Sequence, residues 1–235
     1  MKILVVDTAT DHMMVSLADG TELRAERVEP GGKGSSLRLS RIVEDLCNES
    51  GIHLHSVDLL AVTVGPGAFT GIRVGVGFVQ GVAYALDRPV VPLSTLRCLA
   101  AYAPPLPIPL LSLIDARKGE LYAGLFSPFF PFEPLMEEVV LSPERLVETV
   151  TPPFAAIGSG AISSRELLRA AFGPSCPILD PLPTPSSAPL LPLIVDSHPT
   201  TSLSAADLSP RYLRRPEAEC SPPFSGKNLA LIAKK

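Results

Sequence analysis

The stretch Val64-Gly65-Pro66-Gly67-Ala68-Phe69-Thr70-Gly71-Ile72-Arg73-Val74-Gly75 decides how this chain folds. It follows the apolar run 59–64, which predicts a buried strand, and it leads into an apolar segment, which predicts a helix over 71–86. Thr70 is placed to cap that helix. A strand, a glycine turn and a helix N-terminus together make a loop whose backbone N–H groups can hold an anion or can lock the helix tightly against its sheet.

The predicted helix 71–86 is rich in glycine. Its four glycines are Gly71, Gly75, Gly77 and Gly81. Each costs about 1 kcal/mol relative to alanine inside a helix, and close approach of another backbone is the usual compensation. The first two and the last two form i, i+4 pairs on different faces. Arg73, Gln80 and Tyr84 share one stripe, and nearly everything else is apolar. We expect one side of the helix to lie on its own sheet and the other to meet a neighbouring helix or another protein.

Outward from this stretch, the first hundred residues read as a β-β-β-α-β-α unit. The predicted strands cover 3–6, 13–18, 21–28, 59–64 and 90–92, and the predicted helices cover 36–50 and 71–86. Ser35 or Ser36 can cap the helix 36–50, and Gly51 follows its end. Ser94 can cap a further helix that runs to about Tyr102.

The second half opens with a repeat of the first. Residues 113–126 have the layout of residues 5–18, with an apolar strand that ends in an aspartate, a polar turn and a returning apolar strand. This repeat favours an internal duplication. The two turn aspartates are Asp7 and Asp115. Each can hold a metal-bound water or cap its own turn, and we favour capping because aspartate commonly accepts hydrogen bonds from its own turn. The proline-rich region 174–199 is predicted to be loop with at most one short helix.

Composition bounds the class of protein. The 235 residues are 46% hydrophobic and 19% charged, with a formal net charge of −4, which gives no sign of charge-driven binding to nucleic acid. No apolar run approaches the ~20 residues needed to span a bilayer, and the chain enters a strand at once, which predicts no signal peptide. The cysteines are isolated, which is typical of reduced thiols in a cytoplasm.

The usual catalytic patterns are missing from the sequence. No histidine has a metal-ligand partner at i+3 or i+4, Ser159 lacks the Gly-x-Ser-x-Gly elbow, and the glycine loop lacks Gly-Lys-Ser/Thr. A phosphate-holding hairpin is expected to carry glycine where Ala9 stands. We therefore expect no catalytic, cofactor or metal site. An ATP-dependent phosphotransferase, with Asp7 and Asp115 as metal and phosphate groups, stays open as an alternative, and a peptidase is less favoured.

Four blocks of sequence resemble the bacterial TsaB (YeaZ) family of tRNA threonylcarbamoyladenosine biosynthesis proteins. They are Ile3-Leu4-Val5-Val6-Asp7-Thr8-Ala9-Thr10, the stretch 64–75 quoted above, Ile114-Asp115-Ala116-Arg117-Lys118-Gly119-Glu120-Leu121-Tyr122, and Pro210-Arg211-Tyr212-Leu213-Arg214. The glycine block, with Gly65, Pro66, Gly67, Phe69, Thr70 and Gly71, is the most specific. The resemblance implies an α/β protein with the two-lobed fold of actin, Hsp70 and sugar kinases.

The resemblance also implies a function. A TsaB-like chain is a non-catalytic partner of the catalytic subunit TsaD and, with the ATPase TsaE, supports threonylcarbamoyl transfer to the adenosine next to the anticodon of tRNA. Such a chain meets tRNA only through the complex, has no membrane partner and is cytoplasmic. It can also pair with a second copy of itself.

The family's helix bundle places the partner contact on the predicted helices 36–50 and 71–86. The residues implied at that contact are Arg38, Arg41, Asp45, Arg73, Gly77, Gln80, Gly81 and Tyr84. The resemblance divides the chain into a first lobe over 1–103, a second lobe over 104–214 and an unassigned segment over 215–235. Gly34-Ser35 replaces the family's usual His-Ser before the first helix.

Overall fold

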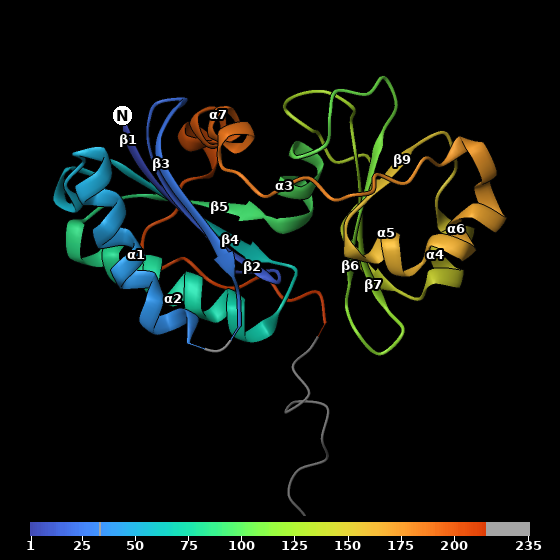
Figure 1. The fold of residues 1–235 in the computed structure, drawn as a ribbon, viewed down its shortest axis with the longest axis horizontal. Coiled ribbons are helices and arrows are strands. Elements are labelled where there is room, and N and C mark those ends of the chain that lie inside the picture. The colour runs from blue at the N-terminus through green and yellow to red at the C-terminus, as the bar shows by residue number, and fades with distance from the viewer. Residues whose placement is uncertain (33, 215–235) are drawn as a thin grey trace, which may run out of the picture.

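The computed structural model describes residues 1–32 and 34–214. The chain folds into two lobes, each built on its own β-sheet (Figure 1). The strand orders are β3-β2-β1-β4-β5 and β8-β7-β6-β9. The strands are β1 (Lys2–Asp7), β2 (His12–Asp19), β3 (Glu22–Pro30), β4 (Leu59–Gly65), β5 (Val90–Ser94), β6 (Leu110–Asp115), β7 (Leu121–Phe126), β8 (Val139–Leu141) and β9 (Ala155–Ile157). These two mixed sheets confirm the predicted two-lobed α/β fold class.

The repeat seen in the sequence is also a repeat in space. In the first sheet, β1 pairs antiparallel with β2 and parallel with β4. In the second sheet, β6 pairs antiparallel with β7 and parallel with β9. Each lobe is thus built on a hairpin, as the layouts of 5–18 and 113–126 predict. The first strand of each hairpin also pairs with a later parallel strand.

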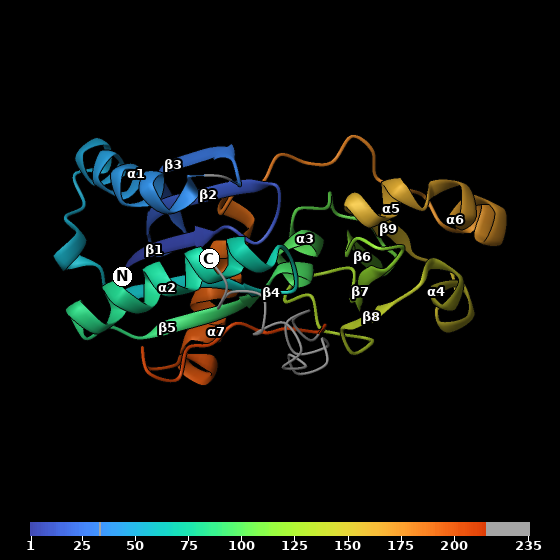
Figure 2. The same cartoon turned by 90° about the horizontal axis from the view of Figure 1, so that it is seen from below.

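Helices cover both faces of the first sheet. One face carries α1 (Ser35–Ser50) and α2 (Phe69–Leu86), and the other carries α3 (Thr95–Ala101) and α7 (Leu191–Thr201) (Figures 1 and 2). Successive side chains of β1 alternate between these two layers: Leu4 packs with the first pair and Ile3 with the second. Because both faces are buried, the central strands β1 and β4 are mainly apolar.

The helix α3 lies between the two sheets (Figure 1). Cys98 and Ala101 pack into the core of the first sheet, while Leu96 and Ala100 pack against the second. The outer face of the second sheet is covered by α4 (Pro143–Thr149), α5 (Ser159–Ser163) and α6 (Arg165–Phe172). Short 3₁₀ turns, η1 (Leu54–Ser56), η2 (Gly173–Ser175) and η3 (Ala188–Leu190), complete the elements.

The predicted cap of α1 is wrong, although its end is confirmed. The helix begins at Ser35 after Gly34, which has a left-handed backbone, and no side chain caps it. The Ser35 hydroxyl instead donates to the carbonyl of Gly32 at 2.8 Å. Gly51 closes the helix with φ 69°, a conformation that glycine adopts without strain.

The predicted start of α2 is also wrong. The helix begins two residues early, at Phe69, and Ala68 occupies the cap position. Thr70 therefore lies in the first turn and does not cap the helix. A backbone hydrogen bond from the Ala68 N–H to the carbonyl of Ala9, in the β1–β2 turn, fixes the cap position. Ser94 caps α3 as predicted, with its hydroxyl oxygen accepting from the Arg97 N–H at 3.3 Å.

The proline-rich region holds one α-helix, as predicted, but α7 has eleven residues and lies on the first sheet. Leu191 and Ile194 join the core there. The predicted division into lobes over 1–103 and 104–214 stays a prediction. The helix α7 belongs to the later range in sequence but packs on the sheet of the first lobe. After α7, Leu203 forms an antiparallel β-bridge with Val90 at the edge of the first sheet. The predicted segment 215–235 lies outside the described residues.

Candidate functional site

The glycine loop packs directly against the β1–β2 turn. The Ala68 N–H donates to the carbonyl of Ala9 at 2.7 Å, and the Thr8 hydroxyl donates to the carbonyl of Gly71 at 2.7 Å. A Cβ atom added at Gly67 would collide with the Ala9 carbonyl, and one at Gly71 would collide with the Thr8 carbonyl. The sequence left two interpretations of this loop open: it holds an anion, or it locks the helix against the sheet. The geometry supports the second, because the Ala68 N–H already donates within the chain.

The four glycines of α2 divide into two packed and two open positions. Gly71 and Gly75 face Thr8, and a Cβ atom at Gly75 would collide with the Thr8 hydroxyl. Gly77 and Gly81 are exposed, and a Cβ atom at either would meet nothing within 4 Å. Contacts inside the chain therefore explain the first pair and leave the second pair unexplained.

The two turn aspartates do cap their own turns. Oδ1 of Asp7 accepts from the Ala9 N–H at 2.9 Å and from the Thr63 hydroxyl at 2.7 Å. Oδ1 of Asp115 accepts from the Arg117 N–H at 2.7 Å. Burial raises the pKa of Asp7 above its ordinary value of 3.8, although these hydrogen bonds and the nearby His12 act to lower it.

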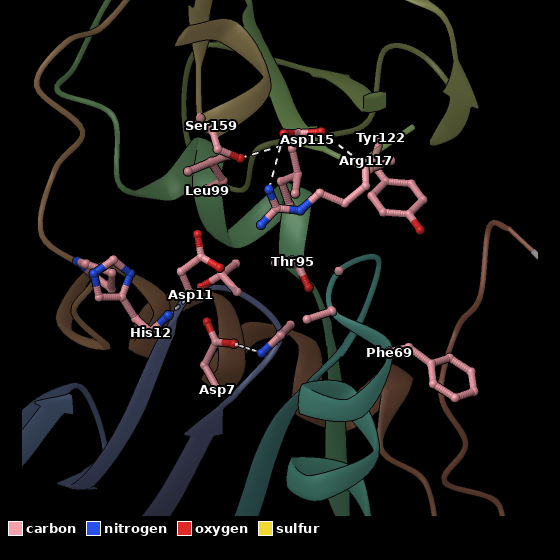
Figure 3. Close-up of a pocket in the computed structure, with 18 of the residues that line it drawn as sticks. Asp7, Asp11, His12, Phe69, Thr95, Leu99, Asp115, Arg117, Tyr122 and Ser159 are labelled. Atoms are coloured by element: carbon pink, nitrogen blue, oxygen red, sulfur yellow. Dashed lines mark hydrogen bonds and ion pairs between the residues drawn. The ribbon is translucent and has the colours of Figure 1, made fainter. Parts of the chain in front are cut away.

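The two aspartates face one cavity between the lobes (Figure 3). Its volume is about 970 Å³. Asp7 and Thr95 lie on the side of the first lobe, and Asp115 and Ser159 lie on the side of the second. The Ser159 hydroxyl oxygen accepts from the Asp115 N–H at 3.1 Å. Within the described residues, no group of three or more His, Cys, Asp or Glu side chains is placed to hold a metal ion.

The outer helix face is the second candidate site. It consists of the exposed residues on the side of α1 and α2 away from the sheet: Leu37, Arg41, Asp45, Gly77, Gly81 and Tyr84. The two helices pack side by side, and Figure 2 looks onto them from outside the sheet. Leu37 is 82% exposed and Tyr84 is 83% exposed. Arg41 and Asp45 form no ion pair with another residue of the described chain.

Three of the predicted partner residues also form bonds within the chain itself. Arg38 pairs with Glu29 at 2.6 Å. Gln80 donates to the carbonyl of Ala205 at 2.8 Å, and Arg73 donates to the Tyr212 hydroxyl at 2.9 Å. Residues 203–214, which we call the C-terminal strap, thus lie along one flank of α2. Arg73 also stacks on the Phe69 ring, 3.8 Å from its centre.

Side-chain bonds join the lobes and the C-terminal strap. Glu138, which precedes β8 and is 6% exposed, accepts from the Ser94 hydroxyl and from Arg211 of the strap. The Arg211 N–H donates to the carbonyl of Val64 at 2.8 Å. Arg97 of α3 donates to the carbonyl of Pro131 at 2.7 Å. The second lobe is therefore fixed to the first at several points.

Sequence reasoning missed two sets of residues. Leu37 lies off the apolar face of α1, so its position in the helical period could have identified it as an exposed leucine. Thr95 and Tyr102 are placed in the cavity by α3, and no local pattern signals that position.

Comparisons with known proteins agree with this architecture. The family model of TsaD, tRNA N6-adenosine threonylcarbamoyltransferase, matches residues 29–168. The tRNA threonylcarbamoyladenosine biosynthesis protein TsaB of Haemophilus influenzae is 29% identical over 91% of this chain and 94% of its own length. The TsaB protein of Escherichia coli is 38% identical over 52% of this chain and 53% of its own length.

Solved structures extend the match to the whole fold. The structure of YeaZ from Pseudomonas aeruginosa is 31% identical, covers 90% of this chain and 99% of its own, and superposes with a TM-score of 0.76. A structure described as an uncharacterized protein with similarity to the peptidase YeaZ, from the same organism, is 32% identical over 91% of this chain and 99% of its own, with a TM-score of 0.79. With the glycine loop, the paired hairpins and full-length relatives in agreement, the chain belongs to the TsaB (YeaZ) family.

Proposed function

We propose that this chain is a non-catalytic accessory subunit in the biosynthesis of threonylcarbamoyladenosine in tRNA. A relative matched over 94% of its length carries that biosynthetic name, and the matching family model describes the transferase TsaD. The proposed role is to hold a TsaD-type catalytic subunit, in a complex that includes a TsaE-type ATPase, in the cytoplasm. Transfer RNA is reached only through that complex.

The open glycines of α2 carry the proposal. A glycine inside a helix costs about 1 kcal/mol relative to alanine, and nothing in the described chain compensates for that cost at Gly77 or Gly81. A partner helix that approaches the α2 backbone closely would compensate for this cost. The neighbouring Tyr84 supplies an exposed aromatic side chain of the kind enriched in protein interfaces.

The apolar composition of α2 has the same explanation. By length and composition this helix could cross a membrane. It lies instead along the first sheet and buries Ile72, Val76 and Val79 there. The opposite side, with Gly77 and Gly81, is the part left for a partner.

The phosphotransferase alternative is disfavoured by the β1–β2 turn. An anion-holding turn needs backbone N–H groups that point into open space. The Ala9 N–H donates to Asp7, and the Ala9 carbonyl is covered by Ala68. Both backbone groups of Ala9 are therefore already bonded within the chain.

The test is co-expression with the TsaD-type subunit of the same cell, followed by size-exclusion chromatography and a tRNA modification assay. The wild-type chain should co-elute with that subunit and restore modification. Gly81→Leu should abolish co-elution, because the new side chain occupies the partner's approach. Ala170→Leu adds a similar side chain at an exposed position of α6 and should leave the complex intact. Unchanged co-elution of Gly81→Leu would remove the outer helix face as the contact.

A further inference from the structure

A second, smaller cavity lies at the edge of the first sheet. Its walls come from the end of β5, the first turn of α3, the helix α7 and the C-terminal strap. Among the described residues it shares none of its lining with the cavity between the lobes. Figure 2 shows α7 beside β5. The volume of this edge cavity is about 250 Å³. Sites for drug-sized ligands measure ~300–1,000 Å³, so the edge cavity suits a smaller molecule.

The charged side chains that line the edge cavity are both cationic. They are Arg97 of α3 and Arg211 of the strap, and no carboxylate of the described residues lines it. Glu138 pairs with Arg211 at 2.8 Å without lining the cavity. Two guanidinium groups and one carboxylate leave one positive charge in excess, which favours a ligand with a single negative charge.

Arg97 has no charged partner of its own. Its Nε and Nη2 both donate to the carbonyl of Pro131, at 3.2 and 2.7 Å. The residue is half-buried, and within residues 1–32 and 34–214 it forms no ion pair. Its Nη1 therefore keeps N–H groups without an acceptor in that part of the chain. A cation partly withdrawn from water is stabilised when an anion pairs with it.

Both guanidinium groups are held in place before any ligand arrives. The Pro131 carbonyl fixes Arg97 through two donors. Arg211 is fixed by Glu138, to which Nη1 donates, and by its own backbone N–H, which donates to the carbonyl of Val64 at 2.8 Å. Nε and Nη2 of Arg211 stay available. Such a fork of N–H groups matches a planar oxyanion, and groups already fixed lose little entropy on binding.

The remaining walls supply one free hydroxyl and an apolar surface. The Ser197 hydroxyl of α7 forms no hydrogen bond to another described residue, so it can donate to a ligand oxygen. Leu93 and Leu193 line the cavity from β5 and α7. An apolar wall with a few fixed polar groups is typical of small-molecule sites.

We propose that the edge cavity binds a small monocarboxylate, with the carboxylate oxygens on Arg97 and Arg211 and the apolar body on Leu93 and Leu193. A carboxylate is planar and carries one negative charge, as the two guanidinium forks and the charge balance require. The proposal is independent of the partner contact, because none of the lining residues belongs to the outer helix face.

NMR titration of the full, nitrogen-15-labelled chain tests this proposal with benzoate, with benzamide and with phenyl phosphate. Benzoate should shift the amide signals of Ser94, Ser197 and Arg211 and leave that of Asp115, in the other cavity, unchanged. Benzamide has the same shape without the charge and should bind at least tenfold more weakly. Arg97→Gln should weaken benzoate binding at least tenfold, the effect of losing hydrogen bonds between charged groups.

Ser197→Leu and Arg88→Gln complete the test. Ser197→Leu keeps both arginines but fills the cavity from α7, so it should also weaken benzoate binding at least tenfold. Arg88→Gln is the matched control, because Arg88 likewise donates to a backbone carbonyl, that of Val57 at 3.0 Å, but lies outside the cavity. It should bind benzoate as the wild type does.

Four results would overturn the proposal. They are the absence of benzoate shifts at the edge cavity, benzamide binding as tight as that of benzoate, phenyl phosphate binding tighter than that of benzoate, and wild-type affinity in both Arg97→Gln and Ser197→Leu.

Discussion

The glycines of α2 show that one residue type serves two purposes within a single helix. Gly71 and Gly75 let the β1–β2 turn reach the helix, and Thr8 fills the space that their side chains would take. Gly77 and Gly81 leave the helix backbone open to solvent in the isolated chain. Alanine substitutions in the isolated chain can therefore test whether the two pairs differ in this way.

Alanine should have opposite effects at the two kinds of glycine. Gly77→Ala should raise the free energy of unfolding by about 0.5–1 kcal/mol, because it adds helix propensity without a clash. Gly75→Ala should lower it by about 1–3 kcal/mol, because its methyl group overlaps the Thr8 hydroxyl. Urea unfolding followed by circular dichroism measures both. Equal destabilisation by the two variants would show that Gly77 is packed in the isolated protein.

Asp7 should make stability depend on pH with a defined sign. Its pKa is higher in the folded chain than the ordinary 3.8, so the folded state keeps a proton that the unfolded state has lost. The free energy of unfolding should therefore fall as pH rises from about 3.8 through the folded pKa, by up to about 1.4 kcal/mol per pH unit.

Asp7→Asn should remove this dependence while its side-chain oxygen still accepts from Ala9 and Thr63. The quantity to compare is the difference in unfolding free energy between the variant and the wild type at a series of pH values. The variant should gain relative to the wild type as pH rises. A difference that stays constant would mean that the Asp7 carboxyl ionises at its ordinary pKa.

The helix α7 shows how a late segment can complete an early lobe. Leu191 and Ile194 are buried in the core of the first sheet, more than a hundred residues after its last strand begins. Shortening a buried apolar side chain of α7 should therefore destabilise the first lobe.

Ile194→Ala should lower the free energy of unfolding by about 2–5 kcal/mol, the range for a buried isoleucine truncated to alanine. Asp196→Ala, at an exposed position of the same helix, should stay within about 0.5 kcal/mol of the wild type. Hydrogen exchange should show the loss of protection in β5, which α7 contacts. If both variants unfold alike, α7 contributes little to the first sheet.

The sequence predicted elements better than it predicted their ends. The strands around Val5 and Val62 follow from apolar runs bounded by turns, which is a local signal. The start of α2 at Phe69 depends on the Ala9 carbonyl, about sixty residues earlier in the chain, and no local pattern encodes such a contact. The serine cap of α3 was predictable because the capping hydroxyl is only three residues away from its donor.

The same limit applies to the candidate sites. The exposure of Gly77 and Gly81 on a face of their own was predictable from helical spacing. The attachment of Gln80 to Ala205 was not, because the acceptor is a backbone carbonyl in an irregular segment. The burial of the Thr95 hydroxyl without a partner in the described part of the chain was also not predictable, because no local pattern encodes it.

Across the whole molecule, Glu138 links three parts that are distant in sequence. Its carboxylate accepts from Ser94 at the end of the first sheet and from Arg211 in the C-terminal strap. Because the side chain is almost fully buried, these are charge-assisted bonds in a largely dry environment.

Glu138→Gln should lower the free energy of unfolding by about 1–3 kcal/mol, the range for losing hydrogen bonds to a charged group. It should also speed hydrogen exchange at the junction of the two lobes. Glu148→Gln changes an exposed carboxylate of α4 in the same way and should be neutral. A neutral result for Glu138→Gln would show that the bonds of this carboxylate add little to the junction of the lobes.

The C-terminal strap has a consequence for biosynthesis. Gln80 and Arg73 reach their settled arrangement only after residues 205–212 have left the ribosome. A nascent chain therefore exposes the flank of α2 until the strap has been synthesised. A subunit that associated before then would meet a surface on which the side chains of Arg73 and Gln80 are not yet fixed.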